Sequence, residues 1–337
     1  MLKLAEEIIH GRRLRSGEDL TFFITADLNQ LCSGADRIRR KLCGDRIDLC
    51  SIINGRGGKC SENCKFCAQS ARSRTGCDVY GFLPQEEFVE DCCRIRNKGV
   101  DRYSIVTAGR TLAGDDLEKA VDTYRAMHNA CPDMVLCASH GLMEEKDLAR
   151  LKEAGVTMYH TNVETSERFF PEICTTHSYA DKKEQIRRAR AAGLTVCSGG
   201  ILGMGETWQD RLDMALLLSE MNITSIPLNF LIPVKGTPLG QRPRLSPDEI
   251  TRIVAVFRYI NPTAFIRIAA GRSYFNDGGA VLFRSGANAT LTGDMLTTVG
   301  NNTLQDREML LSMGFQLKSL PEEYNNQKEG CCYDSAE

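Results

Sequence analysis

The sequence contains no long hydrophobic run and no strong excess of charge of either sign. Its 337 residues carry 42 Lys and Arg against 44 Asp and Glu, which gives a formal net charge of −2. So small a charge offers no basic footprint for nucleic acid. No apolar stretch approaches the roughly 20 residues of a membrane-spanning helix, and residues 1–20 lack the apolar core of a signal peptide. We therefore expect a cytoplasmic protein that binds neither nucleic acid nor a membrane.

Cysteine, in contrast, is abundant, with 15 residues. In a chain that is not exported, this favours metal sites over disulfides. Cys60, Cys64 and Cys67 form a Cys-x3-Cys-x2-Cys triad, and thiolates suit iron–sulfur clusters or zinc. No fourth ligand follows at close spacing, although a zinc site or an electron-transfer cluster would use one. Three thiolates on a four-iron cube leave one iron open to a substrate or cofactor.

The triad, with Phe66 directly before its third cysteine, resembles the signature of the radical S-adenosylmethionine superfamily. The resemblance implies a 4Fe-4S cluster whose open iron chelates the amino and carboxylate groups of S-adenosylmethionine. A structural zinc knuckle, or incidental cysteines in a cysteine-rich chain, is the alternative, because a motif match alone is only a hypothesis.

The rest of the chain alternates short β-branched runs with longer charged runs of helical period. The pattern predicts strands at 47–53, 101–107, 134–138, 157–163, 195–199, 225–231, 264–269 and 287–291. It predicts helices at 84–98, 115–130, 144–154, 179–192, 207–221, 246–260, 277–284 and 304–313. Such alternation indicates parallel βαβ units, and eight units fit an α/β fold of the (β/α)8 TIM-type barrel. We expect a helical N-terminal extension (1–45), the barrel (46–316) and a polar C-terminal tail (317–337), whose composition from residue 321 is typical of disorder.

Polar or metal-binding side chains lie near the ends of the predicted strands. In this fold those ends meet at one mouth, where the active site lies. The cysteine triad follows the first strand, and the next six strands carry Ser104, Cys137, Asn162, Cys197, Asn229 and Arg267. Buried polar groups cost free energy unless they are paired. The mouth is therefore expected to hold polar ligands and metal.

Three longer segments are similar to signature segments of the biotin synthase family: residues 197–207, 235–239 and 266–272. The similarity extends over residues 47–293. It implies insertion of sulfur between two unactivated carbons of dethiobiotin. In such enzymes the 4Fe-4S cluster reductively cleaves S-adenosylmethionine, the 5′-deoxyadenosyl radical removes hydrogen from the substrate, and an auxiliary iron–sulfur cluster deeper in the barrel supplies the sulfur. The resemblance also implies a homodimer and an electron donor such as flavodoxin or ferredoxin.

The resemblance implies roles for individual residues but no catalytic side chain. It implies that the first cluster is held by Cys60, Cys64 and Cys67, and the auxiliary cluster by Cys137, Cys197 and Arg267. It implies that the adenine lies against Phe66 and Ala68, and that S-adenosylmethionine is contacted by Asn162, Glu164 and Arg190. The ureido ring is then bound by Asn162 and Asn229. An amide offers both a donor and an acceptor, and Arg190 offers a fork for a carboxylate. The alternatives are an exposed helical arginine for Arg190 and a buried turn residue for Asn229.

Ser104 departs from the family pattern, which has a cysteine at the end of the second strand. A hydroxyl is a poor substitute for an iron thiolate, so an ordinary 2Fe-2S cluster with three cysteines and one arginine is in doubt. Either another thiol takes part or the cluster is a different, larger one. The candidate thiols are Cys77, Cys92, Cys93, Cys174, Cys331 and Cys332. Cys32, Cys43 and Cys50 precede the mouth and are expected to be small buried hydrophobes.

Cys331 and Cys332 are adjacent in the tail. Their Cα atoms are about 3.8 Å apart across a trans peptide, which is short of the usual disulfide separation, so both thiols stay available to a metal. Our hypothesis is that the tail folds back and gives at least one thiol to the auxiliary cluster, building a four-iron centre with an open iron for a sulfide. A flexible tail with incidental thiols and a metal-delivery hook are the alternatives.

Three functions remain open at this point. The first is sulfur insertion by a member of the biotin synthase family. The second is a related radical enzyme of the same barrel type, such as a hydrogenase-maturation protein or a mutase; Ser104 leaves it open, whereas Cys137 and Cys197 speak against it. The third is a non-enzymatic iron–sulfur or zinc protein.

Overall fold

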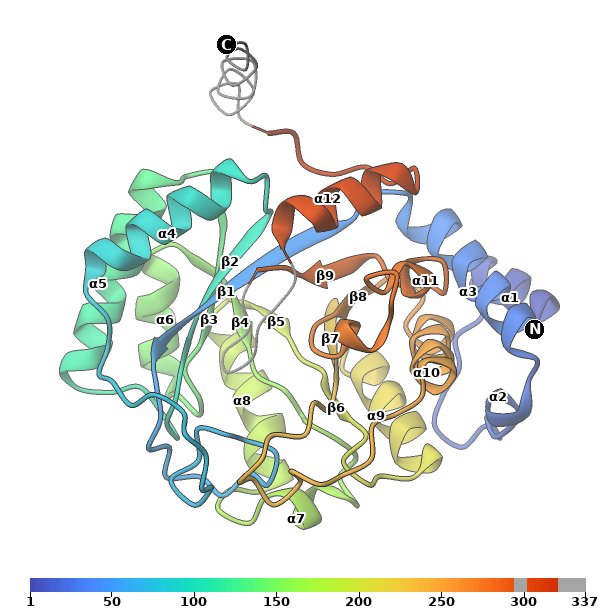
Figure 1. Cartoon of the computed structure of the whole chain (residues 1–337), viewed down its shortest axis with the longest axis horizontal. Coiled ribbons are helices and arrows are strands. Elements are labelled where there is room, and N and C mark those ends of the chain that lie inside the picture. The colour runs from blue at the N-terminus through green and yellow to red at the C-terminus, as the bar shows by residue number, and fades with distance from the viewer. Residues whose placement is uncertain (294–301, 321–337) are drawn as a thin grey trace, which may run out of the picture.

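A barrel of parallel strands surrounded by helices forms the centre of the protein (Figure 1). The computed structural model describes residues 1–293 and 302–320. The strands follow the order β5-β4-β3-β2-β1-β9-β8-β7-β6, and a further pairing of β5 with β7 closes the sheet. The strands are β1 (Asp48–Arg56), β2 (Arg102–Thr107), β3 (Val135–Ser139), β4 (Val156–His160), β5 (Thr195–Cys197), β6 (Gly200–Leu202), β7 (Ser225–Phe230), β8 (Phe265–Ile268) and β9 (Ala289–Leu291). The predicted (β/α)8 barrel is confirmed.

The strand predicted at 195–199 ends at Cys197 as β5, and a second short strand that was not predicted, β6, follows it; both pair with β7. The break falls at Ser198 and Gly199. A Cβ atom on Gly199 would lie 1.9 Å from the Pro227 carbonyl oxygen, so only glycine permits this close approach of two backbones. Together β5 and β6 occupy one of the eight positions around the barrel.

Seven of the eight predicted helices lie within a few residues of their predicted positions, and α7 was not predicted. The helices that follow β1 are α4 (Gln85–Asn97), α5 (Asp115–Ala130), α6 (Glu145–Glu153), α7 (Phe170–Ile173), α8 (Tyr179–Ala191), α9 (Trp208–Glu220), α10 (Pro247–Ile260), α11 (Ala280–Phe283) and α12 (Thr303–Ser312), with a 3₁₀ turn η1 at Arg272–Tyr274. Ser246 caps the N-terminus of α10, because its hydroxyl accepts the Glu249 N–H at 3.2 Å. The helix expected at 277–284 is a single turn, since Gly278 and Gly279 both have positive φ. No helix of the described residues is long and apolar enough to cross a membrane.

The N-terminal residues form helices α1 (Leu2–Ile9), α2 (Phe22–Thr25) and α3 (Leu28–Cys43), which cover the outer side of α10 (Figure 1). Their apolar residues Ile8, Leu31 and Ile38 are fully buried in the same core as the barrel helices. The guanidinium of Arg252 on α10 donates to the carbonyl of Phe23 at 2.9 Å. The extension is therefore packed as part of the barrel core.

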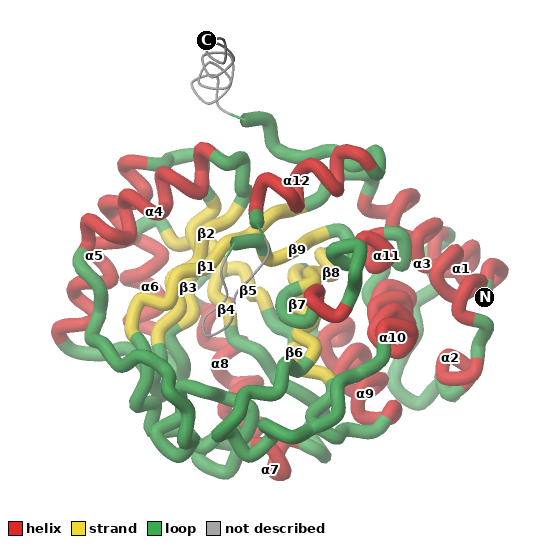
Figure 2. Tube along the Cα trace, viewed as in Figure 1, coloured by secondary structure: helices red, strands yellow, loops and turns green. Residues whose placement is uncertain are grey.

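The long loops after β1 and β7 lie at one end of the barrel, along the lower edge of Figure 2. The Arg74 N–H in the first loop donates to the Gly236 carbonyl in the second at 2.8 Å, and the Lys65 N–H donates to the Ile173 carbonyl of α7 at 3.0 Å. Because these loops follow the strands, they surround the C-terminal end of the barrel, and the cysteine triad lies among them.

Candidate active site

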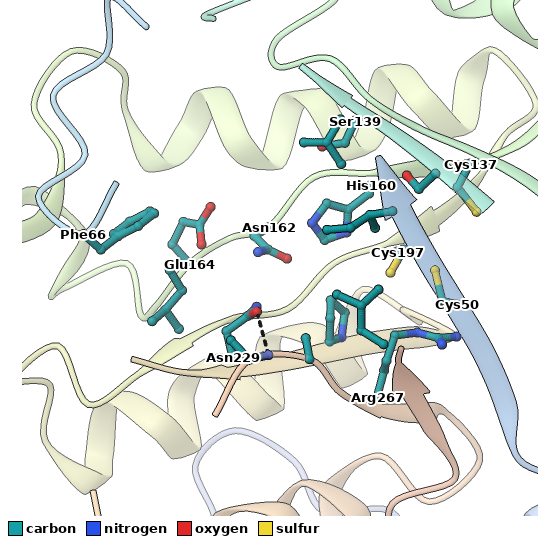
Figure 3. A pocket seen from close by; sticks show the side chains of 18 of the residues that line it. Cys50, Phe66, Cys137, Ser139, His160, Asn162, Glu164, Cys197, Asn229 and Arg267 are labelled. Carbon is teal, nitrogen blue, oxygen red and sulfur yellow. Dashed lines mark hydrogen bonds between the residues drawn. The ribbon is translucent and has the colours of Figure 1, made fainter. Parts of the chain in front are cut away.

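A cavity of about 380 Å³ extends from the cysteine loop into the barrel. Figure 3 shows Phe66 and Glu164 toward one end and a group of thiols with Arg267 at the other. Of the residues predicted from the sequence, the cavity wall includes Phe66, Cys67, Ala68, Cys137, Asn162, Glu164, Cys197, Asn229 and Arg267. Cys331 and Cys332 lie outside the described residues. The widely separated strand ends therefore do meet at one cavity.

The cysteine loop is held in shape by its own backbone. The Cys67 N–H donates to the Cys64 carbonyl at 3.0 Å, and the Cys60 N–H donates to the Gln69 carbonyl at 2.9 Å. The Ser70 hydroxyl donates to the Glu62 carbonyl at 2.6 Å. These bonds fold the loop so that its three thiols are only partly buried. No cysteine in the described part of the chain forms a disulfide, so all three remain available as soft ligands for iron.

Cys64 has a neighbour that the sequence did not place there. Its Sγ lies 3.7 Å from Cys174 Sγ, and Cys174 Sγ lies 3.3 Å from Nδ1 of His177. The side chain of His177 in turn contacts Glu62 Oε2 at 2.5 Å. Within the described residues, Cys64, Cys174 and His177 are a group whose ligand atoms all lie within 4.8 Å of one another. Cys174 therefore lies beside the cysteine loop, and not at the inner end of the cavity.

Asn162 and Glu164 lie in the middle of the cavity wall, after β4. The Gly199 N–H donates to Asn162 Oδ1 at 3.1 Å, so the break between β5 and β6 orients this amide. Glu164 has a φ of 72°, a conformation uncommon for a residue other than glycine. Burial raises the pKa of Glu164, and Lys182 opposes the shift. Its Oε2 is buried without a hydrogen-bond partner, which fits a carboxylate that accepts from a bound ligand.

The prediction for Arg190 disagrees with the structure. Arg190 is exposed on α8 and donates to the carbonyls of Met221 and Asn222 at the end of α9, away from the cavity. A different basic residue of the same helix lies beside Glu164: Lys182 Nζ is 3.9 Å from Glu164 Oε1. With about 3.6 residues per turn, positions 182 and 190 are a little over two turns apart and differ by about 80° around the helix. That difference explains why only one of them faces inward.

Asn229 and His160 complete the middle of the cavity. Asn229 lies on β7, where its Oδ1 accepts the Ala270 N–H and its Nδ2 donates to the Gly200 carbonyl, both at 3.3 Å. These bonds are long and leave the amide at the wall facing the cavity (Figure 3). Burial lowers the pKa of His160 to about 4, so this ring is neutral at pH 7. His160 lines the cavity, where it would contact a bound molecule.

The inner end of the cavity holds three thiols: Cys50 on β1, Cys137 on β3 and Cys197 on β5 (Figure 3). Cys137 and Cys197 were predicted, whereas Cys50 was not. Burial raises the pKa of Cys50 to about 11 and raises the pKa of Cys137 and of Cys197 as well. A bound metal would replace those protons. The donor set is soft and fits an iron–sulfur cluster.

Ser104 lies beside these thiols on β2, with its residue only 4% exposed. Its hydroxyl oxygen is buried and has no hydrogen-bond partner. An unpaired buried hydroxyl costs about 1–3 kcal/mol. The inner end therefore presents a polar atom that the described part of the chain does not satisfy.

A buried ion network lies under the thiols. The Asp48 carboxylate accepts from Arg102 Nε at 2.8 Å and from Arg267 Nη2. Arg267 Nη1 also donates to the Thr290 carbonyl at 3.0 Å. Burial opposes the charge of Arg267, but Asp48 and the nearby thiols raise its pKa above the ordinary value. A protonated guanidinium has no lone pair to give to iron, so the predicted ligand role of Arg267 stays a prediction.

The remaining candidate thiols lie elsewhere. Cys77 is in the loop after β1, where its Sγ donates to the Ala68 carbonyl at 3.2 Å. Cys92 and Cys93 are on α4, and Cys93 Sγ lies 3.2 Å from Cys131 Sγ. None of these residues lines the cavity.

Cys50 could have been found from the period of two in β1, because Asp48, Cys50 and Ile52 all face inward.

Solved structures show the same fold. Methylornithine synthase has a TM-score of 0.81 at 20% identity, with 97% of this chain and 99% of that chain covered. The FeFe-hydrogenase maturase from Carboxydothermus hydrogenoformans has a TM-score of 0.74 at 17% identity, with 93% of this chain and 79% of that chain covered. Identities this low show the fold alone.

Two family models match the chain. The radical SAM superfamily model matches residues 56–218, and the biotin and thiamin synthesis associated domain matches residues 227–316. Radical SAM enzymes use a 4Fe-4S cluster and S-adenosylmethionine, which fits the three thiols of the cysteine loop.

The curated relatives are more specific. The biotin synthase of Clostridium beijerinckii is 60% identical over 317 residues, which is 94% of this chain and 100% of that protein. The biotin synthase of Alkaliphilus metalliredigens is also 60% identical, over 94% of this chain and 99% of that protein. Relatives of this name imply a second, auxiliary iron–sulfur cluster, which fits the inner thiols. The chain is thus an enzyme that belongs to the biotin synthase family of the radical SAM superfamily.

Proposed function

We propose that this enzyme inserts sulfur into dethiobiotin to form biotin. The observation that supports this most strongly is the arrangement of the cavity. The cysteine loop lies at one end, two thiols from separate strands, Cys137 and Cys197, lie at the other, and the amides of Asn162 and Asn229 lie between them (Figure 3). A substrate between the two ends would face both centres at once.

When bound, the first cluster supplies the electron that cleaves S-adenosylmethionine, and the auxiliary cluster supplies the sulfur. The chain itself binds and orients. Asn162 and Asn229 each present an amide, and a cyclic urea offers the matching donors and acceptors. Asn162 Oδ1 is already occupied by the Gly199 N–H, which fixes the direction in which its NH₂ group can donate. Phe66 and Ala68 give the mouth an apolar wall suited to the adenine.

The remaining assignments follow the same proposal. Cys60, Cys64 and Cys67 hold the first cluster, and Glu164 with Lys182 in place of Arg190 contacts S-adenosylmethionine. A flavodoxin or ferredoxin supplies electrons. The protein works in the cytoplasm as a homodimer. The likeness to named biotin synthases over 94% of the chain supports the first cluster and the need for an electron donor, and the position of Lys182 beside Glu164 supports its contact with the cofactor.

Anaerobic reconstitution with iron, sulfide, reductant and S-adenosylmethionine tests the function. We expect biotin from dethiobiotin. Formation of 5′-deoxyadenosine without biotin would support a different radical enzyme, and no cleavage at all would support a non-enzymatic metal protein. The last two outcomes contradict the proposal.

Substitution Glu164→Gln tests the contact with S-adenosylmethionine. The unpartnered Oε2 of Glu164 is available for a charge-assisted hydrogen bond, worth about 1.5–3 kcal/mol. We therefore expect S-adenosylmethionine to bind about 10- to 100-fold more weakly, with iron and sulfide content unchanged. Equilibrium binding to the reconstituted protein measures the effect. The control is Glu167→Gln, whose carboxylate forms an exposed ion pair with Lys183; an unchanged Kd in Glu164→Gln would refute the contact.

A truncation tests the tail. Removing residues 331–337 deletes Cys331 and Cys332, and we expect it to remove the absorption of the auxiliary cluster while cleavage of S-adenosylmethionine is spared. Iron and sulfide counts with absorption spectra measure the loss. The full-length double variant Cys331→Ser, Cys332→Ser separates the thiols from the rest of the tail. Full iron and sulfide retention in the truncated chain would rule the contribution out.

A further inference from the structure

The inner end of the cavity contains one thiol more than the sequence analysis placed there. Building on the function proposed above, we propose that Cys50 is the third cysteine ligand of the auxiliary iron–sulfur cluster, in place of the thiol that Ser104 lacks. Cys50 lies on β1, outside the three signature segments at 197–207, 235–239 and 266–272, and lines the same cavity as Cys137 and Cys197.

The strand register places Cys50 where such a ligand is needed. On β1, Cys50 pairs with Arg102, and Ile52 pairs with Ser104 on β2. Successive side chains of a strand point to opposite faces, so Cys50 and Ile52 point to the same face. Both line the cavity, so this face is the inner one. Cys50 and Ser104 are therefore diagonal neighbours on the inside of adjacent strands. A thiol at either position would face the same end of the cavity.

The three thiols also share one end of the cavity with a buried guanidinium. Cys50, Cys137, Cys197 and Arg267 all line its wall there (Figure 3). Cys50 makes one weak contact of its own, from Sγ to the Ser51 carbonyl at 3.7 Å. That contact does not require a cysteine, so packing alone explains little about its place beside two other thiols and a buried guanidinium.

The hydroxyl of Ser104 is an independent sign of a ligand at this end. It belongs to a residue 4% exposed, lines the cavity and has no hydrogen-bond partner. Buried polar atoms of this kind are normally paired. A sulfide or a bound thiolate at the inner end would accept its hydrogen bond.

The spacing of the thiols favours a cluster over a single ion. Among the described residues, the ligand atoms of Cys50, Cys137 and Cys197 do not all lie within 4.8 Å of one another, unlike those of Cys64, Cys174 and His177. One zinc ion could not reach three thiols so placed without rearrangement. A centre of several irons with bridging sulfides spans a larger distance.

The test is the Cys50→Ala variant of the full chain, reconstituted anaerobically beside Cys137→Ala and Cys197→Ala. We expect all three variants to lose the iron, sulfide and Mössbauer signal of the auxiliary cluster. Each should keep the first cluster and full cleavage of S-adenosylmethionine to 5′-deoxyadenosine. The control is Cys92→Ala, a fully buried thiol on α4, which should keep both clusters. Wild-type iron and sulfide in Cys50→Ala would overturn the proposal.

A second variant separates ligation from a structural role. In Cys50→Ala, Ser104→Cys a thiol returns at the diagonal position, and we expect the auxiliary iron and sulfide to return with it. Loss of both clusters that Ser104→Cys does not repair would also overturn the proposal, because it would show that Cys50 supports the barrel. The proposed function fails separately, if the wild-type chain carries only the iron of the first cluster or makes no biotin.

Discussion

We expect the Cys67→Ser variant to lose essentially all cleavage of S-adenosylmethionine. Cys67 lines the cavity at the end nearest Phe66, so its thiol lies where the first cluster would meet the cofactor. Loss of an outer-shell partner alone costs 10- to 100-fold at metal sites, and loss of a ligand should cost more than about 100-fold. Formation of 5′-deoxyadenosine under reducing, anaerobic conditions measures the effect, together with the iron count.

Cys67 is a better target than Cys64 for this experiment. Cys174 Sγ lies 3.7 Å from Cys64 Sγ and could take the place of a removed Cys64 thiol. The matched control is Cys32→Ser on α3, on the far side of the structure from the cysteine loop (Figure 1), which should cleave the cofactor at the wild-type rate. If Cys67→Ser retains a tenth or more of the wild-type rate, the assignment of the triad is wrong.

The Asp48→Asn variant should show the largest loss of stability. Asp48 pairs with Arg102 and Arg267, and the three side chains are between 4% and 12% exposed. Neutralising it leaves two buried guanidinium groups without their counter-charge, and breaking a buried pair in this way costs about 3–5 kcal/mol. Chemical denaturation measures the free energy of unfolding. The control is Asp122→Asn, whose pair with Arg125 is more than half exposed and should be worth about 0–1 kcal/mol.

The ion pairs of Asp48 with Arg102 and Arg267 also make the free energy of unfolding depend on pH. Burial opposes the charge of Asp48, but Arg267 and Arg102 lower its pKa below the ordinary value. A depressed carboxylate pKa stabilises the fold above the unfolded pKa of about 3.9. The stabilisation is lost as the pH falls through the folded pKa. The difference between wild type and Asp48→Asn should therefore be constant from about pH 5 upward and shrink below about pH 4; a difference that grows in acid would contradict this assignment.

The fold could be predicted almost completely because its signal is local. Strands and helices alternate with different hydrophobic periods, and glycines with positive φ stand where helices were expected to end, at Gly99, Gly155 and Gly193. The break between β5 and β6 could not be predicted. It depends on the approach of Gly199 to Pro227, a contact between segments far apart in sequence.

Only those site residues could be predicted that lie at the ends of strands, where the mouth of the barrel is formed. That rule located Cys137, Cys197, Asn162 and Asn229, all of which line the cavity. It missed Cys50 because Cys50 is the third of the nine residues of β1, well before the end of that strand. In a tilted barrel, a position early in a long strand can lie level with the ends of short strands. On α8 the sequence pointed to Arg190, which faces away from the cavity, because the rotation of a helix relative to the barrel is set by tertiary packing.

The buried salt bridges of Asp48 lie directly beneath the inner thiols. Under the proposed function, a sulfur donor that restores the auxiliary cluster from that side would have to break them. A route from the mouth breaks no such bridge, but it passes Asn162 and Asn229, where dethiobiotin would bind under the proposed function. Dethiobiotin added beforehand should therefore slow the uptake of labelled sulfide, and equal uptake with and without it would argue against this route. Replenishment and catalysis would then compete for one passage, and each working cycle would need an interval in which no substrate is bound.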